Sequence, residues 1–302
     1  MIGQAWRVLR RDGVSGTLRA AKRRAAQRLR LFQHLSKRDL VHGRRVLRVD
    51  GSVMEIPHDQ AWAFPDGTYY ERNVEHWIRR ALNAVPDPVF YDVGANYGYY
   101  SLIAAPLAGA VYAFDPVSTT YTVLQRNIER NGLANLETLK LAIGSKPETR
   151  RMTLYSSSGN NSLVLPAETW EHIETLGFED VPVETLDGLV ADERTRPPDL
   201  IKIDTEGGEL DVLRGASRTL ELHRPLVILE HSETIAAAAG YTLDSIHDEF
   251  EPQGYTLLGL SDPFIDPHDL TLHALERGTP ATVGTVVAVP PKEVWRSTFG
   301  LS

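Results

Sequence analysis

The clearest chemical signal in the sequence is a glycine-containing loop that runs from Asp92 to Gly98 as Asp-Val-Gly-Ala-Asn-Tyr-Gly. It follows a short apolar stretch and opens a helical pattern. Gly94 permits a tight turn after a strand, and Gly98 lets the start of the helix come close to that turn. Backbone N–H groups then point at a polar group above the end of the strand. The acid before the first glycine favours a ligand with a positive ammonium group over a diphosphate.

A second acid follows at the spacing expected for a nucleoside ligand. Asp115 lies 23 residues after Asp92, at the end of the apolar stretch 111–114. A carboxylate at this place can accept both hydroxyls of a ribose. An ammonium group and a ribose are both present in S-adenosylmethionine, so the sequence predicts this ligand, with small residues around Ala142 lining an adenine slot. Alternatively, Asp115 is a helix cap, because Asp115-Pro116 also suits the start of a helix.

A third group of acids follows the apolar stretch that ends at residue 203. Asp204 and Glu206 come directly after it, and the next apolar stretch, 225–229, is followed by Glu230 and His231. Because ligands of open α/β sheets bind beyond the carboxyl ends of the strands, we expect these side chains near the first site. A carboxylate or imidazole there could remove the proton from an attacking hydroxyl.

Each of these four residues also has a structural interpretation. Asp204 can cap the following helix, a single histidine is often structural, and the acids can orient a ligand or bind a metal. The sequence has no decisive set of metal ligands, so we predict no metal site. Lys202, in the middle of a buried stretch, is expected to form an ion pair. A polar loop at 160–162 is either a turn or a part of the ligand site.

The elements that must position these residues alternate between strand and helix from residue 88 onward, which predicts a parallel α/β sheet. Strands are expected at 89–93, 110–114, 136–143, 199–204, 225–230, 255–260 and 284–289, and helices at 99–107, 119–131, 209–222 and 245–253. Before them, 46–65 predicts a hairpin that turns at Asp50-Gly51, and 68–85 predicts a helix. We expect one domain over 46–302, with its core at 88–260.

The first 45 residues form a basic extension. They contain 13 Lys and Arg against two Asp, whereas the rest of the chain contains 19 Lys and Arg against 38 Asp and Glu. Residues 17–35 predict a helix with arginines on one face. This helix could lie on an anionic membrane surface, dock on an acidic partner, pack on the acidic body of its own chain or contribute to a homodimer.

Composition excludes several classes of protein. The chain has no cysteine, which removes disulfides, thiolate metal sites and cysteine nucleophiles, and fits a reducing, cytoplasmic location. No apolar run is long enough to span a bilayer or to form a secretory signal. The acidic body argues against a nucleic-acid partner.

Five sequence blocks together resemble the FkbM family of methyltransferases. They are DVGANYGYYS from Asp92, AFDPVSTTYTVLQRNIERNGL from Ala113, ETLDGL from Glu184, DLIKIDTEGGELDVLRGA from Asp199 and RPLVILEH from Arg224. The resemblance covers residues 88–260, and the KIDTEG block is the most specific. One departure is visible, since family members usually carry Glu at the position of Asp115.

The resemblance implies a seven-stranded, Rossmann-like class I methyltransferase fold, here with the basic helical N-terminal extension. It also implies transfer of a methyl group from S-adenosylmethionine to a hydroxyl of a sugar, glycan or polyketide-type small molecule. The predicted donor contacts are Asp92, Gly94, Asn96, Tyr97, Gly98, Asp115, Ala142 and Asp204. The predicted catalytic residues are Asp204, Glu206, Glu230 and His231. The rival hypotheses are a NAD(P)-dependent oxidoreductase, which the absence of G-x-G-x-x-G disfavours, and a non-catalytic protein that docks through its basic arm.

Overall fold

A computed structural model describes residues 44–64, 69–165, 174–262, 266–278 and 283–301. The chain divides into two compact units, one of Met1–Leu47 with Ile56–Tyr70 and the other of Arg48–Glu55 with Glu71–Ser302. The helix predicted at 17–35 lies outside the described residues, and the predicted basic extension stays a prediction. In the first unit, Trp62 of η1 (His58–Ala63) packs near Tyr70, with ring centroids 5.5 Å apart.

The hairpin predicted near Asp50 is confirmed. β1 (Arg44–Val49) and β2 (Ser52–Pro57) form a two-stranded sheet. Asp50 and Gly51 both have positive φ, 51° and 87°. This combination belongs to the tight turn that matches the twist of a hairpin, and Asp-Gly is a preferred pair for it.

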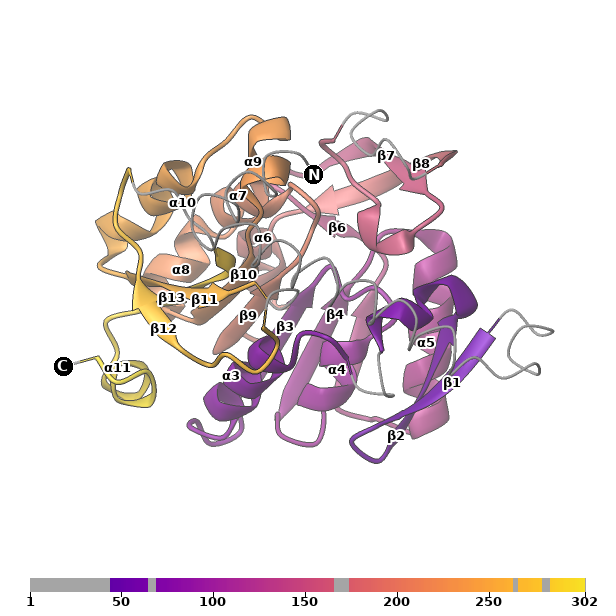
Figure 1. Ribbon diagram of the computed structural model, residues 1–302, viewed down its shortest axis with the longest axis horizontal. Coiled ribbons are helices and arrows are strands. Elements are labelled where there is room, and N and C mark those ends of the chain that lie inside the picture. Colours follow the sequence, from indigo (N-terminus) through magenta and orange to yellow (C-terminus); the bar gives the residue numbers. More distant parts are fainter. Residues whose placement is uncertain (1–43, 65–68, 166–173, 263–265, 279–282, 302) are drawn as a thin grey trace, which may run out of the picture. The chain divides into compact units, whose positions relative to one another are not determined.

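The second unit is built on an eight-stranded sheet (Figure 1). In spatial order its strands are β12 (Leu272–Ala274), β11 (Thr256–Ser261), β13 (Val283–Val289), β10 (Leu226–Glu230), β9 (Leu200–Ile203), β3 (Val89–Val93), β4 (Ala110–Phe114) and β5 (Leu136–Leu139). The five strands from β10 to β5 run parallel, and β13 runs antiparallel between β10 and β11. The seven predicted strands are therefore present, and the short edge strand β12 is an addition to them.

Two predicted elements are each divided into two in the structure. The strand predicted at 136–143 ends at Leu139, where a tight turn bonds the N–H of Leu141 back to Leu139, and the chain then enters a different sheet. The helix predicted at 209–222 is two helices, α7 (Glu209–Arg214) and α8 (Ser217–His223). The interruption lies at Gly215, where a Cβ atom would be 2.0 Å from the carbonyl oxygen of Gly144.

The second sheet has three strands in the order β6 (Ala142–Ile143), β8 (Thr175–Glu184) and β7 (Glu148–Tyr155). Its own small core contains Val117, Ala142, Met152, Val181 and Val183. The sequence analysis did not predict β8, because Gly177 and Pro182 weaken the strand pattern. The short helix η3 (Ser158–Asn160) lies on the chain between β7 and β8.

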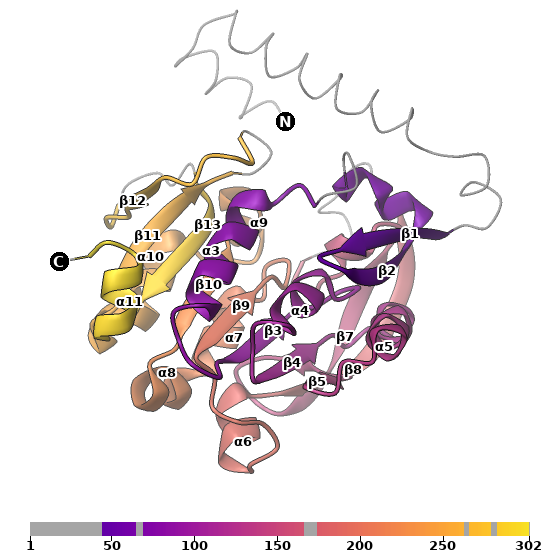
Figure 2. The same cartoon turned by 90° about the horizontal axis from the view of Figure 1, so that it is seen from below.

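Helices cover both faces of the large sheet. Figure 2 shows α3 (Arg72–Leu82) and α4 (Tyr99–Ala104) on one side, and α6 (Leu186–Ala191) and α8 on the other. The second face packs Tyr91, Val93 and Ile203 of the strands against Leu186, Val212 and Leu220 of the helices. The remaining helices are α5 (Ser118–Asn131), α9 (Glu233–Ala238), α10 (Leu243–Phe250) and α11 (Glu293–Thr298), with η4 (Glu251–Gln253) after α10.

The arrangement of β3, β9 and β10 decides where chemistry can occur. These three parallel strands are neighbours, so the loops that follow them meet at one edge of the sheet.

Among the described residues, no helix is long and apolar enough to cross a bilayer.

Candidate active site

The loop after β3 is held by backbone contacts on both sides. The N–H groups of Gly94 and Ala95 both donate to the carbonyl oxygen of Phe114, at 3.0 and 2.9 Å, which ties the loop to β4. Gly94 has a φ of 84°, and a Cβ atom at this residue would lie 1.8 Å from the carbonyl oxygen of Asp204. A residue other than glycine would therefore push apart the loops that follow β3 and β9.

Helix α5 supports the other end of this loop. Gly98 has a φ of 89° and begins α4, and a Cβ atom there would lie 2.6 Å from Leu124 on α5. Asn96 also has a positive φ, 50°, which asparagine tolerates better than most residues. The loop thus has positive φ at Asn96 and Gly98, two residues that tolerate it, and Leu124 of α5 leaves no space for a side chain at Gly98.

Asp92 is buried with one oxygen unpaired. Its side chain is 1% exposed, Oδ2 accepts a 2.6 Å hydrogen bond from Ser101, and Oδ1 has no partner among the described residues. Burial raises the pKa of Asp92, while the charge of Lys202 and the bond from Ser101 act in the opposite direction. An unpaired buried acceptor is costly, and a ligand with an ammonium group is a suitable partner for it.

Asp115 lies at the end of β4 and faces the same loop. Its Oδ2 accepts from the N–H of Asn96 and its Oδ1 from the N–H of Val117, each at 3.1 Å. Burial outweighs these two bonds and raises the pKa of Asp115 to about 8. The remaining lone pairs of the two oxygens are acceptors of the kind that vicinal hydroxyls require.

Two more of the residues predicted to contact the donor, Tyr97 and Ala142, have structural partners. Tyr97 is buried, and its hydroxyl donates to Oγ of Ser158 at 2.6 Å, which links the loop to η3. Ala142 is buried in the core of the three-stranded sheet. Its predicted place in an adenine slot stays a prediction.

The acids after β9 and β10 form one cluster. Oxygen atoms of Asp204, Glu206 and Glu230 lie within 4.8 Å of one another. The sheet register explains part of this, because Ile203 pairs with Leu229 and the next residues, Asp204 and Glu230, are therefore adjacent. These three predicted catalytic residues are brought together, beside the loop that carries Asp92.

Lys202 forms the ion pair expected from the sequence. It is 4% exposed, its Nζ lies 2.7 Å from Oδ2 of Asp204, and the same atom lies 4.6 Å from the ring centroid of Tyr100. Burial alone would lower the pKa of Lys202, but the negative charges of Asp204, Glu71 and Asp92 outweigh it and raise that pKa. Lys202 therefore carries a positive charge that acts on Asp204 of the cluster and also on Asp92 and Glu71.

The three carboxyls of the cluster differ in protonation. Burial would raise the pKa of Asp204, but Lys202 and a hydrogen bond with Glu230 hold it below its usual value. Burial and the charge of Asp204 raise the pKa of both Glu206 and Glu230 well above the usual range. Of the three, Asp204 is therefore the carboxyl that ionises most readily, and it shares a hydrogen bond with Glu230.

Glu206 carries the unpaired oxygen of the cluster. Its Oε2 atom is buried and has no hydrogen-bond partner among the described residues. The residue also has a φ of 52°, an uncommon value outside glycine. Such backbone conformations are often held at functional sites by the surrounding structure.

The loop that contains Glu206 is held by the carboxylate of Glu209, a residue that the sequence analysis did not select. Oε1 of Glu209 accepts from the N–H of Thr205 at 2.9 Å, from its hydroxyl at 3.0 Å and from the N–H of Gly207 at 3.3 Å. Oε2 of Glu209 accepts from the hydroxyl of Tyr241 at 2.7 Å. An acid four residues after Thr205, at the start of α7, is a signal for such a cap.

His231 does not join the cluster. Side chains alternate along β10, and Leu229 packs in the core on the face covered by α6 and α8, so the side chain of His231 follows it to that face. Neither ring nitrogen has a hydrogen-bond partner among the described residues, and burial lowers the pKa of His231. Its role as the base stays a prediction that this placement does not favour.

The segment around η3 connects the two loops of the site. Ser158 accepts from Tyr97 and lies 3.5 Å from Oδ1 of Asn96, while Ser162 donates to the carbonyl oxygen of Glu206 at 2.7 Å. Asn161 caps the end of β7 by accepting from the N–H of Tyr155. The polar loop at 160–162 thus combines a turn with a contact to the candidate site.

The prediction of no metal site stays a prediction. The spacing of the oxygens of Asp204, Glu206 and Glu230 would suit a divalent cation. The ammonium group of Lys202 already compensates part of their charge, however. Acid clusters of this kind also serve as proton acceptors.

Comparison with known proteins gives the family. The model of the methyltransferase FkbM domain matches residues 92–257, more than half of the chain. Together with the strand order and the loop after β3, this match defines an S-adenosylmethionine-dependent methyltransferase with a Rossmann-like fold. The chain belongs to the FkbM methyltransferase family. The alternative of a NAD(P)-dependent oxidoreductase does not agree with this family.

Several curated proteins are similar to the chain. The hexuronic acid methyltransferase AglP of Haloferax volcanii is 30% identical over 165 residues, which cover 53% of this chain and 64% of AglP. The 31-O-demethyl-FK506 methyltransferase FkbM of Streptomyces tacrolimicus is 29% identical over 165 residues, which cover 46% and 63%. The methyltransferase sdnD of Sordaria araneosa is 25% identical over 213 residues, which cover 58% and 82%. The chain thus spans just under two thirds of the length of the first two.

A solved structure of an FkbM methyltransferase, from Methylobacillus flagellatus KT, is similar with a TM-score of 0.41 and 16% identity. The likeness covers 76% of this chain and 54% of that one. The sequence match, not this likeness, places the chain in its family.

Proposed function

We propose that the chain transfers a methyl group from S-adenosylmethionine to a hydroxyl oxygen of a sugar, glycan or polyketide-type small molecule. The observation that carries the proposal is the closeness of two half-sites. The loop with Asp92 and Gly94 lies so near the loop after β9 that Gly94 has no space for a Cβ atom beside Asp204. A donor bound by the first loop would therefore present its methyl group close to the three acids.

The residues present fit the methyl donor. The unpaired Oδ1 of Asp92 suits the ammonium group of the donor, and the two oxygens of Asp115 suit its ribose. Gly94, Asn96 and Gly98 keep the intervening backbone close to the ligand. S-adenosylmethionine supplies a sulfonium methyl group that a nucleophilic oxygen can take up directly.

In the proposed reaction, Glu206 takes the proton of the acceptor hydroxyl. The bond between oxygen and the methyl carbon forms as the bond from that carbon to sulfur breaks, and the products are a methyl ether, S-adenosylhomocysteine and a protonated carboxyl. Glu206 has the free oxygen for this step, and a raised pKa makes it a stronger base once ionised. Asp204 stays ionised beside Lys202 and orients the neighbouring carboxyl of Glu230.

The names of two relatives support the substrate class. One is named for a hexuronic acid and the other for 31-O-demethyl-FK506. A sugar acid has hydroxyls and a carboxylate, so methylation could give an ether or an ester.

The test is methyl transfer from isotopically labelled S-adenosylmethionine to a panel of uronic-acid glycans, neutral sugars and macrolides. We expect a labelled product that survives mild alkali, because ethers resist the treatment that hydrolyses esters. Release of the label by alkali would contradict hydroxyl methylation. Failure of the whole panel, with S-adenosylhomocysteine bound normally, would contradict the proposed acceptor class.

The affinity for S-adenosylhomocysteine is expected to rise with pH between 6 and 8. Ribose hydroxyls donate to the ionised form of Asp115, whose pKa burial raises to about 8, so binding displaces the proton that the free protein holds. About one molecule in a hundred is ionised two pH units below a pKa and about half at the pKa, so the gain reaches up to ~50-fold. Titration calorimetry at several pH values measures it.

Asp115→Asn is the control for this pH dependence. The variant cannot ionise at this residue, so its weaker binding should change little over the same range. A wild-type affinity that does not vary with pH, or an equally steep dependence in Asp115→Asn, would contradict the assignment of Asp115 as the ribose acceptor.

The predictions for the rest of the chain remain part of the proposal. The basic residues before 46 would contact an anionic membrane surface, an acidic partner or a second copy of the chain. A cytoplasmic location is proposed from the absence of cysteine, and the acidic body argues against nucleic acid as a partner.

A further inference from the structure

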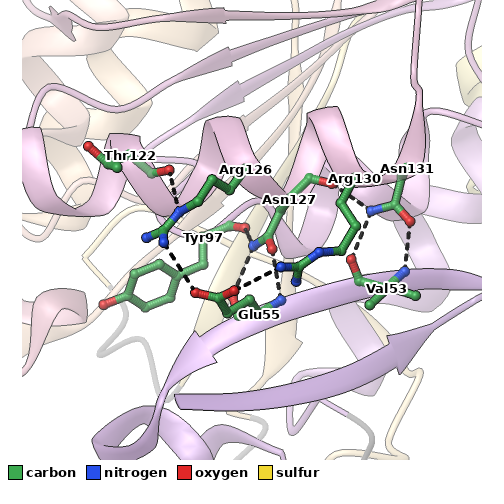
Figure 3. Close-up of polar contacts among 8 residues, drawn as sticks. All are labelled: Val53, Glu55, Tyr97, Thr122, Arg126, Asn127, Arg130 and Asn131. Atoms are coloured by element: carbon green, nitrogen blue, oxygen red, sulfur yellow. Dashed lines mark hydrogen bonds and ion pairs between the residues drawn. The ribbon is translucent and has the colours of Figure 1, made fainter. Parts of the chain in front are cut away.

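Two asparagines of α5 pair with the free edge of β2 as a neighbouring strand would (Figure 3). Oδ1 of Asn131 accepts from the N–H of Val53 at 2.7 Å, and its Nδ2 donates to the carbonyl oxygen of the same residue at 2.8 Å. Asn127 makes the same pair of bonds to Glu55, at 2.7 and 2.9 Å. Two residues of a strand span about 6.6 Å and one helical turn of four residues about 6 Å, so the two elements match.

Charges reinforce this contact. Glu55 is 7% exposed, and its two carboxylate oxygens face the guanidinium groups of Arg126 and Arg130, at 3.7 and 3.0 Å. The strand and the helix are therefore joined by neutral and charged contacts over one turn of α5. Each asparagine takes the place of a backbone partner, which this edge of β2 does not have among the described residues.

Asn127 differs from Asn131 by one further bond. Its Nδ2 also donates to the carbonyl oxygen of Tyr97 at 2.8 Å, within the donor loop. The corresponding bond of Asn131 goes to the carbonyl of Asn127 on its own helix, at 2.6 Å. Asn127 has no exposed surface, so solvent does not compete with this bond in the wild-type protein.

The peptide between Tyr97 and Gly98 controls the start of α4. The N–H of Gly98 donates to Ala95, its carbonyl oxygen accepts from Leu102, and its positive φ must be maintained. The N–H of Asn96, one residue before Tyr97, donates to Asp115. Tyr97 therefore lies in the loop that leads from Asp92, the proposed partner of the ammonium group, and that bonds to Asp115, the proposed partner of the ribose. A bond that orients the carbonyl of Tyr97 acts on the backbone of this loop.

We propose that Asn127 is a positioning residue for the methyl donor, which holds the carbonyl of Tyr97 and so couples the β2 edge to the donor loop. The proposal rests on the proposed function for the identity of the ligand. Asn131 serves only the attachment of β2 to α5. Variants of these two residues on α5 therefore distinguish an effect on the donor loop from an effect on the attachment of β2.

The experiment compares Asn127→Ala with Asn131→Ala in the full chain. Both variants lose two bonds to β2 and should lose thermal stability to a similar degree. Only Asn127→Ala removes the bond from Asn127 to the carbonyl of Tyr97, so the Kd for S-adenosylhomocysteine should rise about 5- to 50-fold. In Asn131→Ala it should stay within about twofold. Titration calorimetry at a temperature where both proteins are folded gives the two values.

Hydrogen exchange provides a readout that does not depend on the ligand. Amides of residues 98–102 should exchange faster in Asn127→Ala than in Asn131→Ala, since only the first loses support for the start of α4. If Asn127→Ala does not fold, Asn127→Ser, with a small polar side chain, replaces it in both measurements. Equal Kd values and equal exchange in the two variants would overturn the proposal. Absence of binding to the wild type would instead contradict the proposed function.

Discussion

Glu206→Gln is expected to lower kcat for methyl transfer by about 10²–10⁴-fold, the range over which general bases usually contribute. The amide keeps the size of the side chain but cannot take the proton of the acceptor hydroxyl. The affinity for S-adenosylhomocysteine should change little, because the proposed donor contacts lie at the ends of β3 and β4 and on the loop after β3. Steady-state rates combined with calorimetry separate the two effects.

The pH profile tests the same assignment. A base acts in its ionised form, so the wild-type rate should rise with pH through the raised pKa of Glu206. In Glu206→Gln this rise should be absent. The matched control is Glu129→Gln, at an exposed glutamate on α5, which should leave both rate and profile unchanged.

His231→Asn examines the alternative base. A rate that falls in this variant while Glu206→Gln stays active would assign the proton transfer to the imidazole. Loss in both variants with normal donor binding would mean that the site depends on more of its surroundings than one base. Full activity of Glu206→Gln would remove Glu206 from the mechanism.

The second large effect concerns stability. Lys202→Met is expected to lower the free energy of unfolding by about 3–5 kcal/mol, the typical cost of removing one partner of a buried ion pair. The buried ammonium group compensates Asp204, Asp92 and Glu71, and without it their charges repel one another in a medium of low polarity. Urea unfolding monitored by circular dichroism measures the loss.

Two further variants show whether charge is the cause. In the double variant Lys202→Met with Asp204→Asn, one of the uncompensated charges is gone, and about 1–3 kcal/mol should return as coupling energy. Lys140→Met removes an exposed lysine that pairs with Glu179 at 3.5 Å, and this should cost at most about 1 kcal/mol. If Lys202→Met costs no more than Lys140→Met, Lys202 is not the electrostatic centre of the site.

Much of the donor half could be predicted from the sequence because its signals are local. Asp92, Gly94 and Gly98 lie where a strand turns into a helix, and Asp115 lies at the end of the next strand. Alternating strand and helix patterns predicted the parallel sheet. The preference of Asp-Gly for a tight turn, also a local signal, predicted the hairpin at Asp50-Gly51, where both residues have positive φ. Lys202 was expected to be paired because a buried lysine requires it, and Asp204 is that partner.

The acceptor half depended on tertiary structure. Glu230 and His231 are adjacent in the sequence, yet the alternation of β10 sends only Glu230 to the cluster with Asp204 and Glu206. The split between β5 and β6, and the break at Gly215, come from backbone contacts with distant residues.

Long-range bonds also decided which residues support the site. Tyr241, 32 residues away, bonds to Glu209, which holds the loop of Glu206. Asn127 bonds to the carbonyl of Tyr97 and to Glu55, which are 30 and 72 residues away from it in the sequence. Local patterns determine which chemical groups a chain carries to the end of a strand. Only the register between strands and the packing of helices determine which of those groups meet, because both depend on residues that are far apart in the sequence.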